Sequence, residues 1–260
     1  MMSVDTSENA SEIRDLRQAY LVSLRGPQEA WLEEQVHVRE TVFRLFVHQG
    51  QPIGYCCVDP CKHLLLQFFI TQEFSRFSVE AFESVVHEQQ IERAYVTTRD
   101  PMALSLCLTF QKRVTLESLL FEHRFPSDIS LKEIGDSQFR LARHLDAQRI
   151  VDVSGDFYRD VESEIKSERL YLLTSRENLL GIGYMGTQFC SPRSANLGMY
   201  TNVSFRRRNV GSYILQKLVE ECHDSGLSPI AACYHENDES KRTLEKAGFA
   251  AYDRTVLVSF

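Results

Sequence analysis

Residues 200–212 read YTNVSFRRRNVGS, the end of one periodic segment, a turn with successive arginines, and the start of another. The hydrophobic pattern predicts a strand over Ala195 to Val203 and a helix from about Asn209 to Asp224. The first amides of a helix have no acceptor within it, and the helix dipole adds partial positive charge there. The segment therefore predicts a binding site for a phosphate or diphosphate group.

Single residues in this turn suit that prediction. Asn209 tolerates left-handed backbone angles, and Gly211 has no side chain to obstruct a ligand. Three arginines, Arg206 to Arg208, add positive charge at the rim. Two other interpretations remain open at this point, namely a solvated arginine face and a glycine that marks close helix packing.

A second segment follows at a suitable distance. The pattern predicts a strand over Pro229 to His235 and a helix over Asp238 to Ala247. We expect Asp238 to be the N-cap of this helix, Ser240 to lie in its first turn and Gly248 to end it. An ordinary capped helix explains these three residues, but it does not explain Asn237 at the end of the strand.

The two segments together resemble the GNAT superfamily of N-acyltransferases. The pyrophosphate motif of that superfamily matches Arg206, Asn209 and Gly211, with Asn209 in place of the first glycine. A later motif matches Asn237, Ser240, Lys246, Gly248 and Phe249.

The resemblance implies acetyl-CoA or another acyl-CoA as co-substrate, bound partly by strand-like pairing with the pantetheine arm. The implied cofactor-binding residues are Thr201, Asn202, Val203, Arg206, Arg207, Arg208, Asn209, Val210, Gly211, Ser212, Asn237, Ser240 and Lys246.

The resemblance also implies a reaction, in which an amine of a small molecule or peptide attacks the thioester directly. Two catalytic groups found in other members are replaced here, because the positions of a tyrosine and a glutamate fall at Leu244 and near Ala232. Tyr234, His235 and Tyr200 are the alternative catalytic candidates. An imidazole has an ordinary pKa of about 6.5, which suits proton transfer, and a tyrosine can protonate a thiolate. Packing at strand ends is the competing interpretation for the tyrosines.

Before these segments, the hydrophobic pattern predicts a strand at Ile129 to Ile134 and helical stretches near Ser137 to Asp146 and Asp156 to Ser167. Strands at Leu170 to Thr174 and Leu180 to Thr187 follow. The N-terminal half repeats this order of elements. Residues 51–55 correspond to residues 179–184, and residues 74–80 correspond to residues 205–211. We therefore predict an α/β (α+β) fold of tandem GNAT-like domains, each a mixed, mostly antiparallel central sheet flanked by helices. The predicted domains are residues 1–126 and 127–260, with a junction near residues 125–128. A single large mixed α/β domain is the alternative.

The first copy is predicted to have lost the cofactor site. Glu80 stands where Gly211 stands in the second copy, and Phe77 replaces an arginine. A carboxylate at that position would repel a diphosphate.

Composition excludes other classes. The formal charge of −7 disfavours nucleic acid, and no apolar run approaches the length of a membrane span. The polar N-terminus and the odd number of cysteines, seven, favour a cytoplasmic protein with reduced thiols. The spacing of Cys56, Cys57, Cys61 and His63 is not that of a zinc site, so no metal is expected.

The sequence is compatible with a monomer and with a homodimer. An acyl-CoA-binding regulatory or interaction module without turnover is the alternative function.

Overall fold

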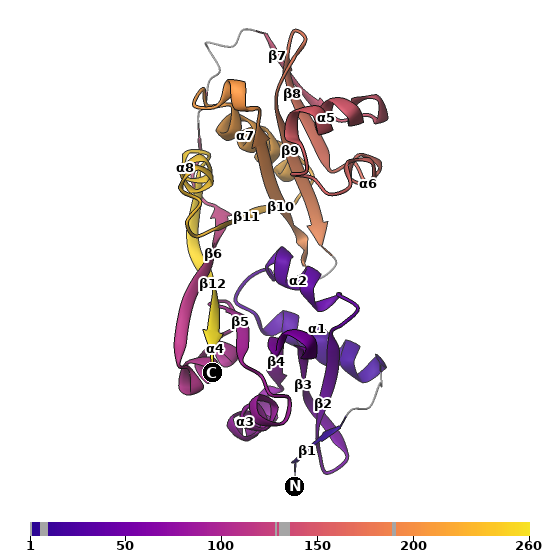
Figure 1. Ribbon diagram of the computed structural model, residues 1–260, viewed down its shortest axis with the longest axis vertical. Helices are drawn as coiled ribbons and strands as arrows, with labels where there is room; N and C mark the ends of the chain where they lie inside the picture. The colour runs from indigo at the N-terminus through magenta and orange to yellow at the C-terminus, as the bar shows by residue number, and fades with distance from the viewer. Residues whose placement is uncertain (1, 6–9, 128, 130–135, 189–190) are drawn as a thin grey trace. The chain divides into compact units, whose positions relative to one another are not determined.

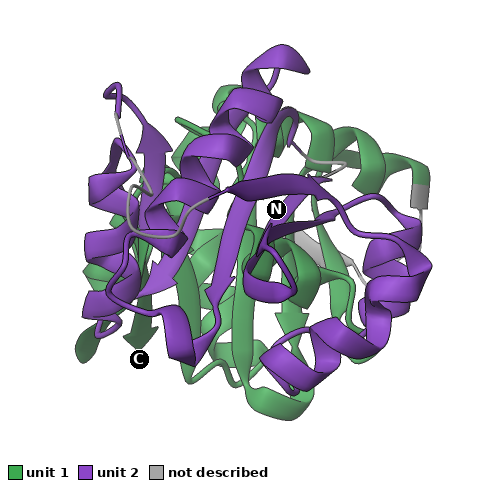
Figure 2. Cartoon of the chain, turned by 90° about the horizontal axis from the view of Figure 1, so that it is seen from above, with its two compact units in different colours: residues 1–119, 253–260 green, residues 120–252 purple. Residues whose placement is uncertain are grey.

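The computed structural model describes the chain except for residues 1, 6–9, 128, 130–135 and 189–190. It divides the chain into two compact units (Figure 2). Unit 1 comprises Met1–Leu119 together with Asp253–Phe260, and unit 2 comprises Leu120–Tyr252. The last eight residues thus belong to the first unit, which a single division point in the sequence does not anticipate.

Unit 1 is a sheet with helices (Figure 1). Its elements are β1 (Met2–Asp5), α1 (Ala10–Ser23), α2 (Ala30–Val36), β2 (Val42–His48), β3 (Gln51–Asp59), η1 (Pro60–Lys62), β4 (Leu64–Ile70), η2 (Gln72–Phe77), α3 (Ser78–Glu88), β5 (Arg93–Thr97), α4 (Pro101–Phe110) and β6 (Arg113–His123), which continues into unit 2. Strands β1 to β4 pair as antiparallel neighbours, and β4 pairs with β5 in parallel.

Unit 2 follows the same plan. Its elements are β7 (Ser137–Leu141), η3 (His144–Asp146), α5 (Ala147–Ser154), α6 (Val161–Lys166), β8 (Leu170–Ser175), β9 (Asn178–Gln188), β10 (Ser191–Thr201), η4 (Val203–Phe205), α7 (Val210–Asp224), β11 (Ser228–Tyr234), α8 (Asp238–Lys246) and β12 (Phe249–Ser259), which ends in unit 1. Strands β7 to β10 pair as antiparallel neighbours, and β10 pairs with β11 in parallel.

Each unit has a glycine at the same position of its sheet, which shows how closely the two units correspond. Gly54 of β3 pairs with Ile70, the last residue of β4, and Gly181 of β9 pairs with Thr201, the last residue of β10. A Cβ atom would lie 2.2 Å from the Phe69 carbonyl oxygen at the first site and 2.6 Å from the Tyr200 carbonyl oxygen at the second. Only glycine fits such a close backbone approach. The predicted tandem fold is therefore confirmed.

The elements at the start of unit 2 differ from the sequence prediction. A helix was expected near Ser137 to Asp146, but Ser137–Leu141 is strand β7, paired with Tyr171–Ser175. Phe139 and Leu141 alternate with polar residues, and the Phe139 ring stacks on Tyr171 at 5.3 Å between ring centroids. This period of two is the strand signal that the helical interpretation overlooked. The helix expected over 156–167 begins only at Val161, because Asp160 caps it. The strand expected over 129–134 lies, except for Ile129, outside the described residues.

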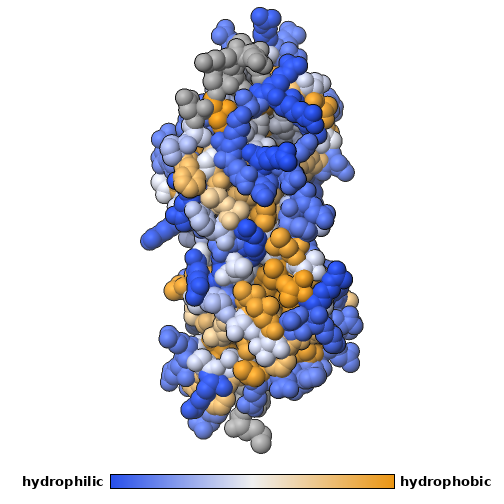
Figure 3. Space-filling model, turned by 90° about the vertical axis from the view of Figure 1, so that its left-hand side faces the viewer, coloured by the Kyte–Doolittle hydropathy of each residue, from blue (hydrophilic) through white to orange (hydrophobic). Residues whose placement is uncertain are grey.

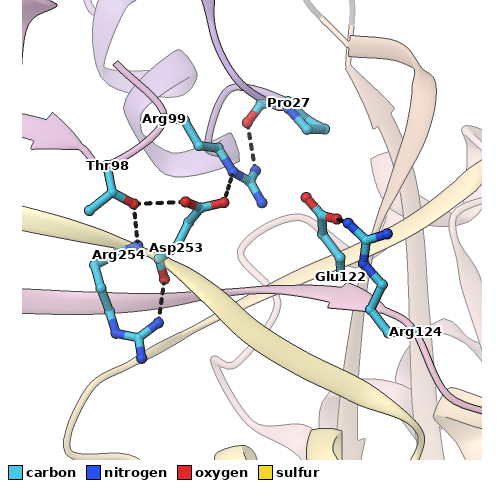
Figure 4. Close-up of polar contacts among 7 residues, drawn as sticks. All are labelled: Pro27, Thr98, Arg99, Glu122, Arg124, Asp253 and Arg254. Atoms are coloured by element: carbon cyan, nitrogen blue, oxygen red, sulfur yellow. Dashed lines mark hydrogen bonds and ion pairs between the residues drawn. The ribbon is translucent and has the colours of Figure 1, made fainter. Parts of the chain in front are cut away.

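The last strand of the chain completes the sheet of unit 1. Residues 255–259 of β12 pair with residues 93–97 of β5 in antiparallel register. Beside this pairing the Arg99 guanidinium, 3% exposed, donates from Nε to Asp253 Oδ2 at 2.8 Å and from Nη1 to the Pro27 carbonyl at 2.7 Å (Figure 4). Thr98 Oγ1 donates to the other Asp253 oxygen at 2.9 Å. The terminal strand is thus held by the charge of Asp253 as well as by its pairing with β5.

Exposed apolar residues of unit 1 include Leu108 and Val114. One face of the molecule, in Figure 3, shows apolar side chains among hydrophilic ones, as is usual for globular proteins. Of the helices in the described parts of the chain, none combines the length and apolarity that crossing a membrane requires.

We expect Asp253→Ala to destabilise unit 1 by about 2–3 kcal/mol, since a nearly buried guanidinium loses its carboxylate partner. Trp31, the one tryptophan of the chain, lies in α2 with its ring 4.7 Å from that of Tyr95, so its fluorescence in urea reports on unit 1. Asp15→Ala, at an exposed position of α1, is the control and should change stability by less than about 0.5 kcal/mol. Equal effects of the two variants would contradict this role of Asp253.

A second prediction concerns pH. Burial raises the pKa of Glu29 to about 7, while its carboxylate accepts a hydrogen bond from Thr255 Oγ1 at 3.0 Å. The unfolded chain releases this proton near pH 4.5 and the folded chain only near pH 7, so the contribution of Glu29 to stability is lost as pH rises through that window. In Glu29→Gln, the decline in the free energy of unfolding between pH 4.5 and 8 should be smaller by about 2 kcal/mol. Urea titrations followed by Trp31 fluorescence measure it, and an unchanged decline would refute the assignment.

Candidate active site

Strands β10 and β11 diverge soon after they meet. Their parallel pairing joins Ser194–Asn196 to Ser228–Ile230. Beyond these residues β10 continues to Thr201 and β11 to Tyr234, and the two strands make no further pairs among the described residues. On its other side β10 stays paired with β9 from Ala195 to Thr201. The edge of β10 that faces β11 is therefore open over residues 197–201.

Helix α7 begins just beyond this open edge. Arg207 and Asn209 have φ of 61° and 64°, so the chain turns sharply into the helix, and Asn209 adopts the left-handed conformation that asparagine tolerates. The first helical hydrogen bond runs from the Tyr213 amide to the Asn209 carbonyl at 2.9 Å. In the described parts of the chain no group accepts from the amides of residues 210–212. Three donors therefore remain at the positive end of a 15-residue helix.

The two segments singled out in the sequence meet here. Lys246 Nζ, at the end of α8, donates to Asn209 Oδ1 at 2.7 Å, and Ser212 Oγ donates to the Thr243 carbonyl at 3.1 Å. The Asn209 side chain is thus used to hold the turn rather than to cap α7. Lys246 adds positive charge next to the free amides.

The structure gives a different reason for glycine at position 211 from the one expected from the sequence. A Cβ atom there would lie 3.0 Å from Thr201 Oγ1 and 3.0 Å from Thr243 Cγ2, so it would point into protein. Position 211 is glycine because α7 packs tightly on the end of β10 and on α8. Of the interpretations weighed for this glycine, helix packing is the one the geometry supports, and a bound ligand would meet its amide rather than its Cα face.

The cap of α8 also differs from the prediction. Asn237, not Asp238, is the N-cap, since its Oδ1 accepts from the Ser240 amide at 3.0 Å. Capping therefore accounts for both Asn237 and Ser240. Gly248, with φ of 87°, ends the helix as expected.

The remaining cofactor-binding candidates line the same turn. Asn202 holds the loop by donating from Nδ2 to the Leu179 carbonyl at 2.8 Å and accepting from the Ser204 amide at 3.1 Å. Arg206 Nε donates to the Thr201 carbonyl at 3.4 Å. The Arg208 guanidinium lies 5.7 Å from the centre of the Phe205 ring. Val203 and all three arginines are exposed, so their side chains are accessible to a ligand.

The catalytic candidates lie on the two diverging strands or directly after them. Tyr234 ends β11 and is 49% exposed, and its ring centroid lies 4.6 Å from that of His235. His235 Nε2 is 3.8 Å from Glu236 Oε1. Tyr200, half-buried on β10, contacts Phe157 with 5.1 Å between ring centroids. Leu244, at the position where the resemblance implies a tyrosine in many GNAT enzymes, is buried, and Ala232 is exposed.

The corresponding place in unit 1 is built differently. Strands β4 and β5 also pair over a short stretch, at Leu64–Arg93 and Leu65–Ala94. The space beyond is lined by buried side chains such as Tyr20, Gln67 and Asp100, leaving a cavity of about 10 Å³. No described residue from 72 to 80 has a positive φ, so η2 runs straight into α3.

No three histidine, cysteine or acidic side chains within the described residues come together to hold a metal ion. Cysteines of the described ranges form no disulfide, and Cys56, Cys57, Cys107 and Cys222 are buried. Cys190 lies outside the described residues.

Comparisons with known proteins identify the family of both halves of the chain. A family model described as "Acetyltransferase (GNAT) domain" matches residues 9–124, and one described as "Acetyltransferase (GNAT) family" matches residues 140–249. No curated protein matches the chain significantly. The chain belongs to the GNAT acetyltransferase family and carries two of its domains.

Solved structures show the same fold. A GNAT-family acetyltransferase from Colwellia psychrerythraea is 22% identical over 99% of both chains, with a TM-score of 0.86. A GCN5-related N-acetyltransferase from Sphaerobacter thermophilus is 13% identical over 99% of this chain and 94% of its own, with a TM-score of 0.65. A tandem GNAT protein from the clavulanic acid biosynthesis pathway, 10% identical, covers 100% of this chain and 98% of its own with a TM-score of 0.60.

Sequence reasoning missed one contact of the site, because Thr243 contacts the start of α7 but matches no motif position. The resemblance to the GNAT superfamily implies that residues around Asp156 to Asp160 line the acceptor pocket. These residues form the loop between α5 and α6, which carries Phe157 and Tyr158.

We expect Gly211→Ala to cost about 1–2 kcal/mol, because the added methyl group is too close to two threonine side chains. Thr243→Ser removes the Cγ2 atom and should recover part of that loss in the double variant. Calorimetric unfolding of the two single variants and the double variant gives the coupling energy. Strict additivity would show that Gly211 is not constrained by Thr243.

Proposed function

We propose that unit 2 transfers an acetyl or other small acyl group from acyl-CoA to a primary amine of a small molecule or peptide. One observation carries the proposal. The open edge of β10 ends beside the free amides at the start of α7, so one extended ligand can pair with a strand and place a diphosphate at a helix terminus.

The residues present fit such a cofactor. Main-chain groups of residues 197–201 on this edge, apart from the Thr201 carbonyl that accepts from Arg206 Nε, offer donors and acceptors in a row, as an amide-bearing pantetheine arm requires. The amides of residues 210–212, with Arg206 to Arg208 and Lys246 around them, suit a diphosphate. Bound there, acyl-CoA supplies an activated carbonyl as a thioester.

The chain's part of the reaction is to position the amine and move protons. The amine nitrogen forms a bond to the thioester carbon, the carbon–sulfur bond breaks, and the sulfur leaves with the bonding pair. We assign His235 the removal of the proton from the attacking amine. Tyr234 or Tyr200 would give a proton to the departing thiolate. Open main-chain amides of β10 would stabilise the negative charge on the carbonyl oxygen.

A second candidate function is motivated by the absence of two catalytic groups. The tyrosine often used in the family would fall at Leu244, and the glutamate used in some members would fall near Ala232. Unit 2 would then bind acyl-CoA as a regulatory or interaction module without turnover. Release of free thiol from acetyl-CoA with any amine would exclude it.

For unit 1 we propose a supporting role without cofactor. Glu80 in the first turn of α3 and the buried side chains between β4 and β5 both oppose a diphosphate-bearing ligand. The unpaired buried thiols support the predicted cytoplasmic location.

The test is binding of acetyl-CoA. At one hundred times its dissociation constant, acetyl-CoA should stabilise the chain by about 2.7 kcal/mol in thermal unfolding. Arg207→Glu, at an exposed position beside the free amides, should weaken acetyl-CoA at least about tenfold by titration calorimetry. It should leave S-acetylpantetheine, which lacks the diphosphate, unaffected.

Lys166→Glu at the end of α6 is the control, with the same charge change at an exposed position. Absence of any stabilisation by acyl-CoA would overturn the proposal. Equal weakening by the two variants would show that the arginine turn does not hold the diphosphate.

A further inference from the structure

An aromatic cluster lies beside the open end of β10. Phe157 contacts Tyr158 edge to face, with 4.9 Å between ring centroids, and Tyr200 at 5.1 Å. The loop that carries Phe157 is held at both ends. Gly155, with φ of 59°, ends α5, and Asp160 Oδ1 accepts from the Ser163 amide at 2.9 Å to cap α6. Phe157 is nevertheless 57% exposed.

The alternation of β10 separates this cluster from the helix that carries the free amides. Met199 and Thr201 face α7, since both lie near the missing Cβ of Gly211. Tyr200 points to the opposite face, where it packs with Tyr158 and Tyr184 against the core formed with α5 and α6. The cluster therefore adjoins the open edge of β10 from the face away from α7.

Two details indicate a ligand rather than a plain surface. Phe157 is exposed but held by two other rings, edge to face with Tyr158 and tilted by 56° to Tyr200, so it presents an apolar face that is already ordered. The Tyr158 hydroxyl is buried without a hydrogen-bond partner within the described residues, a costly state that a polar ligand atom would relieve.

Local charge argues against a polycation as that ligand. Asp160 is engaged as a helix cap, and the exposed Arg159 offsets the exposed Asp156. A polyamine or aminoglycoside would need several free carboxylates, whereas this loop offers one balanced pair of charges and two rings, with Tyr200 of β10 as the third ring of the cluster.

We propose that the acceptor of unit 2 is a primary amine attached to an aromatic body, which stacks on Phe157 and Tyr200. The inference rests on the proposed acyl transfer. It adds Phe157 as the residue that decides acceptor specificity.

The test compares phenylalaninamide with alaninamide, which share the amine and differ by the phenyl ring. Their dissociation constants for the full chain are measured by titration calorimetry in the presence of coenzyme A, independently of turnover. Wild type should bind phenylalaninamide at least about tenfold more tightly. Phe157→Ala should abolish this preference without weakening alaninamide, and Phe157→Tyr should retain it.

Phe125→Ala is the matched control, because Phe125 is also in unit 2 and 56% exposed. It should leave the preference unchanged. Equal binding of the two amides by wild type, or no binding of either, overturns the inference. So does a preference that survives in Phe157→Ala. If acetyl-CoA still stabilises the chain and other amines release its thiol, the proposed acyl transfer stands while the aromatic acceptor is refuted.

Discussion

The parallel pairing of β10 with β11 ends after three residue pairs, and the rest of the site depends on that divergence. A fully paired β10 would have no free main-chain groups, because β9 already satisfies its other edge. Divergence leaves an edge that another extended molecule can pair with. It also directs the end of β10 into the turn where α7 presents its free amides, so both features arise from one backbone path.

The same divergence in unit 1 has a different outcome. There, β4 and β5 pair at two positions among the described residues, but buried side chains from α1, β4 and α4 line the space between them. The turn into α3 also lacks the left-handed residues that Arg207 and Asn209 supply in unit 2. One backbone plan therefore carries a candidate ligand site in one copy and a filled core in the other. Side chains, not topology, make that difference.

Much of this could be predicted from the sequence. Hydrophobic period located most strands and helices of unit 2, and the echoes between residues 51–55 and 179–184 revealed the tandem plan. Local errors had local causes, as at Ser137–Leu141, where a strand period of two was taken for a helix. The roles of residues that depend on tertiary contacts were harder to predict. Gly211 is a packing residue and Asn237 a helix cap, and neither fact can be read from a motif.

By itself, the sequence determined the family, the repeated order of elements and the turn of residues 205–211, because period and backbone preference are local properties. Only the tertiary structure decided that residues 253–260 belong to the sheet of unit 1, that Lys246 holds Asn209, and that Phe157 meets Tyr200. These contacts join residues far apart in the chain. Such contacts depend on complementary shape and charge in three dimensions. The linear pattern of the sequence does not contain this information.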